Sequence, residues 1–188
     1  GCVDSLVANY TATGKPRKMC DFTPNGINNK RPDRASIVYT GLIRRFYKNT
    51  KPIVLGGIEA SLRRIAHYDF KTDKVRRSIL FDSKADYIIY GMGEVPVLEF
   101  ANAVNNNEDV KKIRGLCYIS KEVCDNAVIL PSYEEALSDK KLFHKMFKLF
   151  SDNSQAQSAK TLVQKTGDRY LIQNPPAFYN DEILDEIS

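Results

Sequence analysis

The sequence lacks the residue spacings by which proteins usually hold metal ions. Its four cysteines, Cys2, Cys20, Cys117 and Cys124, lie far apart with no CxxC or CxxxCxxC spacing, and neither of its two histidines is next to a cysteine. We therefore interpret the cysteines as reduced thiols rather than metal ligands. Scattered serines and so few histidines also give no basis for a nucleophile triad.

Long apolar runs are also absent. No stretch approaches the roughly eighteen uninterrupted apolar residues that a membrane span needs, and residues 1–10 have no basic region followed by an apolar block. We expect a cytoplasmic protein with no membrane partner. Its 188 residues, 43% of them hydrophobic, are enough for a sizeable core, which favours one domain with an appendage.

Positive charge is concentrated in one part of the chain. Residues 30–80 hold 13 Lys or Arg and 4 Asp or Glu, a net charge of +9, so the rest of the chain carries −4 of the total of +5. Such a block could attract phosphate-bearing ligands or nucleic acid. It is equally well explained as a solvated basic face.

The N-terminal part is expected to be helical, with one long loop. Residues 2–10 (CVDSLVANY) are typical of a helix with no strand before it, which suggests a domain that lacks its first strands. Residues 11–32 have three prolines and no sustained periodicity, as in a loop. Apolar residues at helical spacing then predict a helix over residues 33–49, with Asp33 capping its first turn.

A strand, glycine turn and helix follow one another twice in the next segment. The apolar run PIVLGG (52–57) predicts a strand buried on both faces, and ADYIIYG (85–91) repeats it. Helices are expected over residues 59–67 and 95–104, with a short helix over 75–80 between the two units. This repetition predicts an α/β fold with an open, mostly parallel sheet and helices on both faces, of partial flavodoxin-like or cobalamin-binding-like form.

The C-terminal part has a different character. Residues 116–119 and 127–130 are expected to be short strands, possibly paired as a hairpin, before a helix that begins with Ser132 and Glu135 at capping-box spacing. An aromatic-rich helix over 142–150 and a strand over 169–173 precede Asn174-Pro175-Pro176, which stops regular structure. We therefore divide the chain into an α/β domain, residues 1–130, and a helical extension and linker, residues 131–188.

Two glycine turns are the main candidates for a binding site. Ligands of parallel sheets bind beyond the carboxyl ends of the strands, where Gly56-Gly57 and Gly91-Met92-Gly93-Glu94 are placed. Glycine lets the backbone approach a ligand closely and exposes amides at the start of the next helix. Neither turn has the dinucleotide or P-loop pattern, and each is equally explained as a tight turn that needs no ligand.

A polar stripe is expected on the helix after the first glycine turn. Glu59, Arg63 and His67 recur at i, i+4 spacing, with Arg64 next to Arg63, and could present an acid, a cation and a titratable ring to a substrate. The simpler interpretation is a surface pair of Glu59 and Arg63 with His67 solvated or packed beside them.

Three double-arginine pairs form a second candidate surface. Arg44-Arg45, Arg63-Arg64 and Arg76-Arg77 are interleaved with aromatic residues, as on an RNA-binding surface. Helical spacing assigns at least Phe46 to the core instead.

Long strings of this sequence resemble the YgiQ-type radical SAM protein family. The strings are KRPDRASIVYTGLIRRFYKN, PIVLGGIEASLRRIAHYDF and DKVRRSILFDSKADYIIYGMGE, followed by LPSYEEALSDKKLF and GDRYLIQNPPA. The resemblance implies that this chain is the accessory region of an enzyme in which a CxxxCxxC motif holds a 4Fe-4S cluster that reductively cleaves S-adenosylmethionine.

The same resemblance limits what this segment does alone. The cluster motif would follow the NPPAF segment, so these residues should neither bind a cluster nor cleave S-adenosylmethionine without the radical SAM barrel. The region is also similar to cobalamin-binding domains, in which the glycine turns would lie beside the cofactor. The chain has no Asp-x-His-x-x-Gly motif, however, so cobalamin is only one option besides substrate positioning, RNA binding or a scaffold role.

Overall fold

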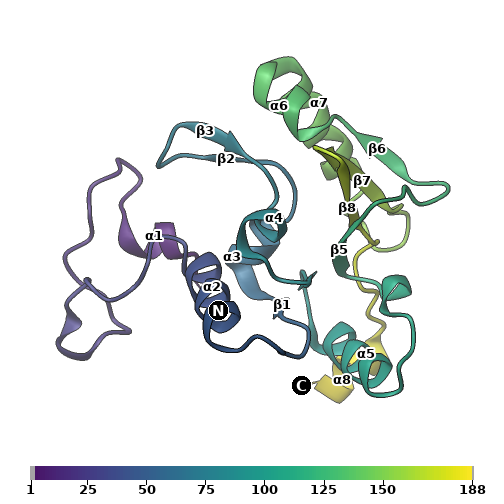
Figure 1. Cartoon of the computed structure of the whole chain (residues 1–188), viewed down its shortest axis with the longest axis horizontal. Coiled ribbons are helices and arrows are strands. Elements are labelled where there is room, and N and C mark those ends of the chain that lie inside the picture. Colours follow the sequence, from purple (N-terminus) through teal and green to yellow (C-terminus); the bar gives the residue numbers. More distant parts are fainter. Residues whose placement is uncertain (1–2, 188) are drawn as a thin grey trace.

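The structure is a computed structural model that describes residues 3–187, so the interpretation of Cys2 lies outside the described residues. Figure 1 shows the main sheet from β1 near the centre of the view to β6 on the right, with the N-terminal helix and loops on the left. The strands are β1 (Val54–Leu55), β2 (His67–Asp69), β3 (Lys74–Arg76), β4 (Tyr87–Ile89), β5 (Leu116–Ser120), β6 (Val128–Leu130), β7 (Leu162–Thr166) and β8 (Arg169–Gln173). The α-helices are α1 (Ser5–Asn9), α2 (Ala35–Phe46), α3 (Gly57–Leu62), α4 (Ile79–Ser83), α5 (Glu94–Asn105), α6 (Tyr133–Ser138), α7 (Lys140–Asp152) and α8 (Asp181–Ile187).

The main sheet is open and mixed, with the strand order β1-β4-β5-β8-β7-β6. β1 with β4 and β6 with β7 are parallel, whereas β5 is antiparallel to both of its neighbours and β7 is antiparallel to β8. The prediction of an α/β fold is confirmed, and the prediction of a mostly parallel sheet is wrong. The register explains why β5 is antiparallel to β4, because Ile89 at the end of β4 lies opposite Leu116 at the start of β5. The chain after α5 therefore returns to the edge at which β4 ended, and β5 runs back along it.

The C-terminal part supplies two central strands of this sheet. β7 and β8 form a hairpin around Gly167, whose φ of 60° suits glycine, and β8 pairs with β5. This hairpin lies between β5 and β6, so the two strands expected as a hairpin do not pair with each other. Residues 131–188 are thus not simply a helical extension, because they complete the sheet. The division of the chain at residue 130 stays a prediction.

The core lies on both faces of the sheet. One cluster joins Ile88, Cys117 and Leu171 to buried residues of α3, α4, α6 and α7. The other joins Ile89, Leu116 and buried residues of α5 on the opposite face. Neighbouring strand residues enter opposite clusters, as the two-residue period of a strand requires. Each fully buried Leu or Ile in these clusters stabilises the fold by about 2 kcal/mol.

Local elements confirm most of the expected helices and correct three details. Ser132 and Glu135 form the expected capping box of α6. Asp33 does not cap α2, because its carboxylate accepts hydrogen bonds from Asn9 Nδ2 at 3.0 Å and from the Tyr10 hydroxyl at 2.8 Å. Residues 74–76 form a strand, β3, rather than a helix.

The third correction concerns the helix after the first glycine turn, which ends at Leu62 instead of residue 67. The backbone beyond it is held by other parts of the fold. The Ala66 N–H donates to Gln164 Oε1 at 2.8 Å, and the Arg63 carbonyl accepts from the Ile79 N–H at 2.8 Å. None of the helices between residues 3 and 187 is both long and apolar enough to cross a membrane.

Candidate functional site

The two glycine turns lie side by side at the carboxyl ends of two neighbouring strands. β1 and β4 are parallel neighbours, with Leu55 opposite Ile88, so both strands end at the same edge. The Gly91 N–H donates to Ser61 Oγ of α3 at 3.4 Å. A Cβ built on Gly56 would lie 3.7 Å from the Ile89 carbonyl oxygen. This arrangement confirms the expected placement of both turns, and we call residues 56–57 and 91–93 the glycine edge.

Backbone conformation explains two of these glycines. Gly57 has a φ of 80° and Gly91 a φ of 72°, which L-residues with a side chain rarely adopt. A Cβ on Gly91 would meet no atom within 4 Å, so this turn is open on its outer side. Gly93 is the N-cap residue of α5, and Glu94 lies in the first turn of that helix. The glycine edge therefore exposes backbone that a bulky neighbour could approach.

Arg64 joins the glycine edge to the far half of the sheet. Its guanidinium carbon lies 4.3 Å from the centre of the Tyr90 ring and 4.5 Å from that of Phe150 on α7. Its Nε donates to Gln173 Oε1 at 3.0 Å, and an Nη donates to the Ser61 carbonyl. Burial lowers the pKa of Arg64. Within residues 3–187, no carboxylate forms an ion pair with it.

β8 ends at the same edge, because it runs in the same direction as β4. The Tyr90 hydroxyl, next to Gly91, donates to the Asn174 carbonyl at 2.5 Å, and the Gly115 N–H donates to the Pro175 carbonyl at 2.7 Å. Burial raises the pKa of Tyr90. The Asn-Pro-Pro segment, expected to be only a linker, is thus fixed to the sheet.

The chain then crosses the second glycine turn. The Tyr179 hydroxyl donates to the Met92 carbonyl at 2.9 Å and accepts from the Val95 N–H at 3.4 Å. Glu94 Oε2 lies 3.5 Å from the same hydroxyl. Tyr179 therefore occupies the start of α5, and α8 follows from this edge of the sheet (Figure 1).

The expected stripe of Glu59, Arg63 and His67 does not exist, because α3 ends before Arg63 and His67 begins β2. The alternative surface pair is also wrong. Glu59 is buried and accepts from the Ser5 N–H at 3.0 Å and from the Ser36 N–H at 3.2 Å. Arg63 instead forms an ion pair with Asp4.

These three side chains do share a small internal cavity, which lies on the side of the fold that faces α2. Its volume of about 10 Å³ is room for one water molecule at most. Burial lowers the pKa of His67 to about 4, with Arg63 and Arg76 nearby also lowering it, so the ring is neutral near pH 7. No residue of the glycine edge lines this cavity, so the cluster and the glycine edge do not form a single crevice.

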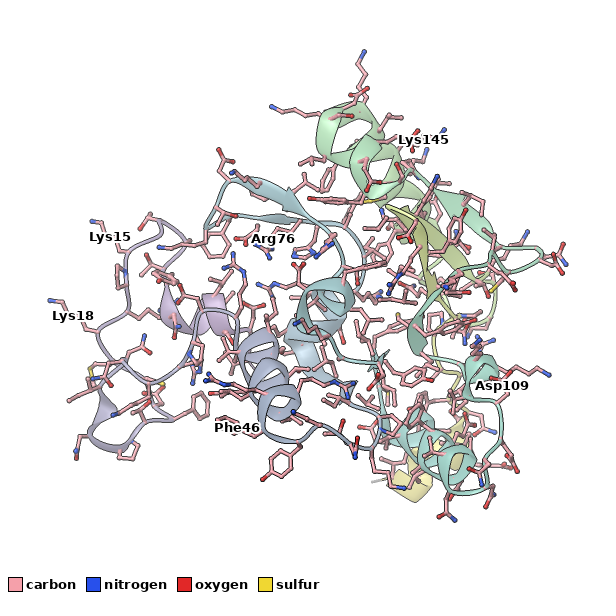
Figure 2. All side chains as sticks on the ribbon, in the orientation of Figure 1. Lys15, Lys18, Phe46, Arg76, Asp109 and Lys145 are labelled. Carbon is pink, nitrogen blue, oxygen red and sulfur yellow. The ribbon has the colours of Figure 1, made fainter. Side chains whose placement is uncertain are left out.

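Five of the 13 basic side chains of residues 30–80 form ion pairs within the described fold. Arg44 pairs with Asp86 at 2.5 Å, and both Arg76 and Arg77 pair with Asp82 at 2.7 Å. Figure 2 shows Arg76 between the β2–β3 hairpin and the helices, whereas Lys15 and Lys18 point outward from the N-terminal loop. The partner carboxylates Asp82 and Asp86 lie outside residues 30–80 in sequence. The arginine pairs therefore do not form a continuous exposed surface for nucleic acid.

The described cysteines do not fit a 4Fe-4S cluster. Cys117 is buried in the centre of the sheet, where burial raises the pKa of its thiol to about 12. Cys20 and Cys124 lie in separate loops. Among residues 3–187, no three His, Cys, Asp or Glu side chains are grouped in a way that could hold a metal ion.

Comparison with known proteins gives matches along the whole chain. Residues 1–188 match the family described as "Radical SAM N-terminal". A UPF0313 protein of Fusobacterium nucleatum is 58% identical over 189 residues, which cover 100% of this chain and 33% of that protein. A UPF0313 protein of Thermotoga petrophila is 46% identical over 191 residues, covering 100% of this chain and 34% of the relative. The chain thus spans about a third of the length of these curated relatives. No solved structure matches it.

Proposed function

Because this chain belongs to the Radical SAM N-terminal family, we propose that it is the accessory domain of a radical SAM enzyme and that its glycine edge packs against the catalytic core. In this position, the domain helps to place the substrate or a cofactor over the core. Radical SAM enzymes cleave S-adenosylmethionine with a 4Fe-4S cluster held by a CxxxCxxC motif. This chain contains no such motif, so the cluster belongs to the remaining part of the full-length protein.

The observation that carries the proposal is the meeting of three strand ends at one edge. β1, β4 and β8 all end beside the glycine edge, and Arg64 contacts residues at two of these ends, Tyr90 and Gln173. Catalytic and binding sites of α/β sheets favour the carboxyl ends of the strands. Open backbone at Gly91 allows a second protein surface to approach closely.

The path of the chain supports the same arrangement. After β8, residues 174–176 are bound to the sheet, and Tyr179 is bound to the turn at Met92. A catalytic core joined after α8 would therefore start next to the glycine edge. A short connection at this point would keep the two domains at high effective concentration, which favours a contact between them.

Two glycines with the same local geometry allow a matched test in the full-length protein. Gly91 (φ 72°) and Gly14 (φ 75°) both have open space around a built Cβ, but Gly14 lies in the N-terminal loop. The bulky side chain in Gly91→Trp should block the contact of the glycine edge with the core, while Gly14→Trp carries the same backbone strain elsewhere. The rate of 5′-deoxyadenosine release from S-adenosylmethionine, with dithionite as reductant, reports on the assembled core.

We expect Gly91→Trp to lower this rate about tenfold or more, because small misplacements of an active site have effects of that size or larger. Gly14→Trp should stay within about twofold of the unchanged protein, since its effect is confined to an exposed loop. Equal rates in the two variants would contradict the proposal.

A further inference from the structure

β1 ends the sheet with an unpaired outer side, and this side is distinct from the glycine edge. In the order of the described strands, β1 has β4 as its single neighbour. The Ile53 carbonyl accepts from the N–H groups of Asp86 at 2.9 Å and Tyr87 at 3.3 Å, so the backbone groups of Ile53 face β4. Because backbone groups alternate in direction along a strand, the N–H and C=O of Val54 point away from β4. They are available to one more strand.

An apolar groove runs along this open side. A cavity of about 460 Å³ lies between β1 and α2. Its walls include Val54 and Leu55 on β1 with Ile53 just before them, and Tyr39 and Ile43 on α2. Ligand and peptide grooves have volumes of a few hundred Å³, and their walls are mainly apolar. The groove is therefore large enough for the side chains of an extended peptide.

The exposure of the apolar side chains of α2 indicates that a layer is missing under this helix. Thr40 is the single buried residue among its 12 described residues. Tyr39 is 51% exposed and Ile43 39% exposed. A helix that covers a sheet normally buries such an apolar stripe against the strands below it. Here the sheet stops at β1, before it reaches the stripe.

We propose that this groove holds an additional β-strand from the part of the full-length protein outside these 188 residues. The added strand hydrogen-bonds to the outer side of β1 at Val54, and its alternate apolar side chains fill the space under α2. The proposal does not depend on the function of the glycine edge, because it concerns the outer side of β1 rather than its carboxyl end.

Three observations favour this occupant. The relatives are about three times as long as the chain, so the rest of a full-length polypeptide could supply the strand. The groove offers an unpaired backbone donor and acceptor, which an added strand satisfies and an apolar small molecule does not. The edge of β1 is only the two residues Val54–Leu55, which is little area for a stable dimer of two copies.

Hydrogen exchange measured by mass spectrometry tests the proposal by comparing the full-length protein with the 188-residue chain. Peptides that cover residues 35–46 and 53–55 should exchange about tenfold or more slowly in the full-length protein, because the added strand removes both from water. Equal exchange in the two proteins would overturn the proposal. Protection that disappears on dilution would point to a second copy instead, and protection lost on unfolding, desalting and refolding would point to a bound small molecule. Both results would also overturn it.

Two substitutions on one helix give a matched control in the full-length protein. Ile43→Lys places a charge inside the groove. Phe46 lies on the same helix and does not line the groove, and the prediction that it belongs to the core is wrong, because its side chain is 69% exposed. Ile43→Lys should return exchange at residues 53–55 to the fast rate of the 188-residue chain, and Phe46→Lys should leave it slow. If both variants stay protected, the groove does not hold the strand.

Discussion

Arg64 and Tyr90 are stacked where β4 ends, with the guanidinium carbon of Arg64 4.3 Å from the centre of the Tyr90 ring. The contact joins the segment after α3 to the residue that precedes Gly91. Since Arg64 also donates to Gln173 on β8, one side chain fixes the relative positions of the strand ends that form the proposed docking edge.

The loss of Arg64 should therefore weaken the whole fold. Arg64→Met keeps the length of the side chain between Tyr90 and Phe150 but removes the cation and its hydrogen bonds. We expect the free energy of unfolding to fall by about 2 kcal/mol, the usual size of a desolvated cation–π contact. Arg64→Lys, which keeps the charge, should lose less. Urea denaturation measures both, and equal stability of Arg64→Met and the unchanged chain would contradict this role.

His67 should make stability depend on pH. Its pKa falls from about 6.5 when unfolded to about 4 in the fold, chiefly through burial, so the unfolded chain binds more protons between these values. The contribution of His67 to the free energy of unfolding is fully present above pH 6.5. As the pH falls toward 4, it decreases by up to about 3 kcal/mol. Denaturation midpoints of the unchanged chain and of His67→Gln, measured from pH 7 to pH 4, should show a smaller slope for the variant. Parallel slopes would show that His67 is not buried as described.

Asp69 should be the most sensitive carboxylate of the basic block. Although burial opposes its ionisation, its hydrogen bond and ion pair with Arg34 keep its pKa below the usual value. Asp69→Asn leaves this arginine without a charged partner, and the loss of one member of a buried pair destabilises by about 3 kcal/mol or more. Asp73→Asn on the same hairpin is the control, because exposed Asp73 accepts only from the Tyr68 hydroxyl among its described hydrogen bonds. Thermal unfolding should separate the two variants clearly, and similar midpoints would contradict the prediction.

The two glycines at the end of β1 should differ in their tolerance of a side chain. Gly57 has a φ of 80°, so Gly57→Ala should destabilise by about 1 to 2 kcal/mol. Gly56 is extended, and its Cβ would make only ordinary contacts, so Gly56→Ala should be nearly neutral in stability. Chemical denaturation gives both values. A similar loss at both positions would mean that close approach, rather than backbone conformation, selects the pair.

Local sequence patterns predicted the elements on each side of the glycine turns well. The apolar runs before Gly56 and Gly91 end two strands at one edge, because alternating strand and helix favour parallel neighbours. The same rule failed for β5, since nothing in residues 106–115 indicates that the chain returns to the end of β4 before it pairs. β7 was missed, because LVQKT mixes polar and apolar residues although four of its five side chains are buried.

The charged residues show why the candidate site was only partly predictable. Helical spacing grouped Glu59, Arg63 and His67, but tertiary hydrogen bonds such as that from the Ala66 N–H to Gln164 end the helix before the pattern is complete. The partners of Arg34, Arg44 and Arg63 are distant in sequence, as Asp4 is from Arg63. Arg64 was selected only as one of a pair of arginines, and no sequence signal indicated Phe150 or Gln173 as its partners.

The contact between the glycine edge and a catalytic core can be measured directly by photocrosslinking in the full-length protein. A benzoylphenylalanine side chain at the position of Gly91 should crosslink to residues beyond Ser188, whereas the same group at Gly14, where the space is equally open, should not. Crosslinks from position 91 that reach only residues 1–188, or none at all, would contradict the account.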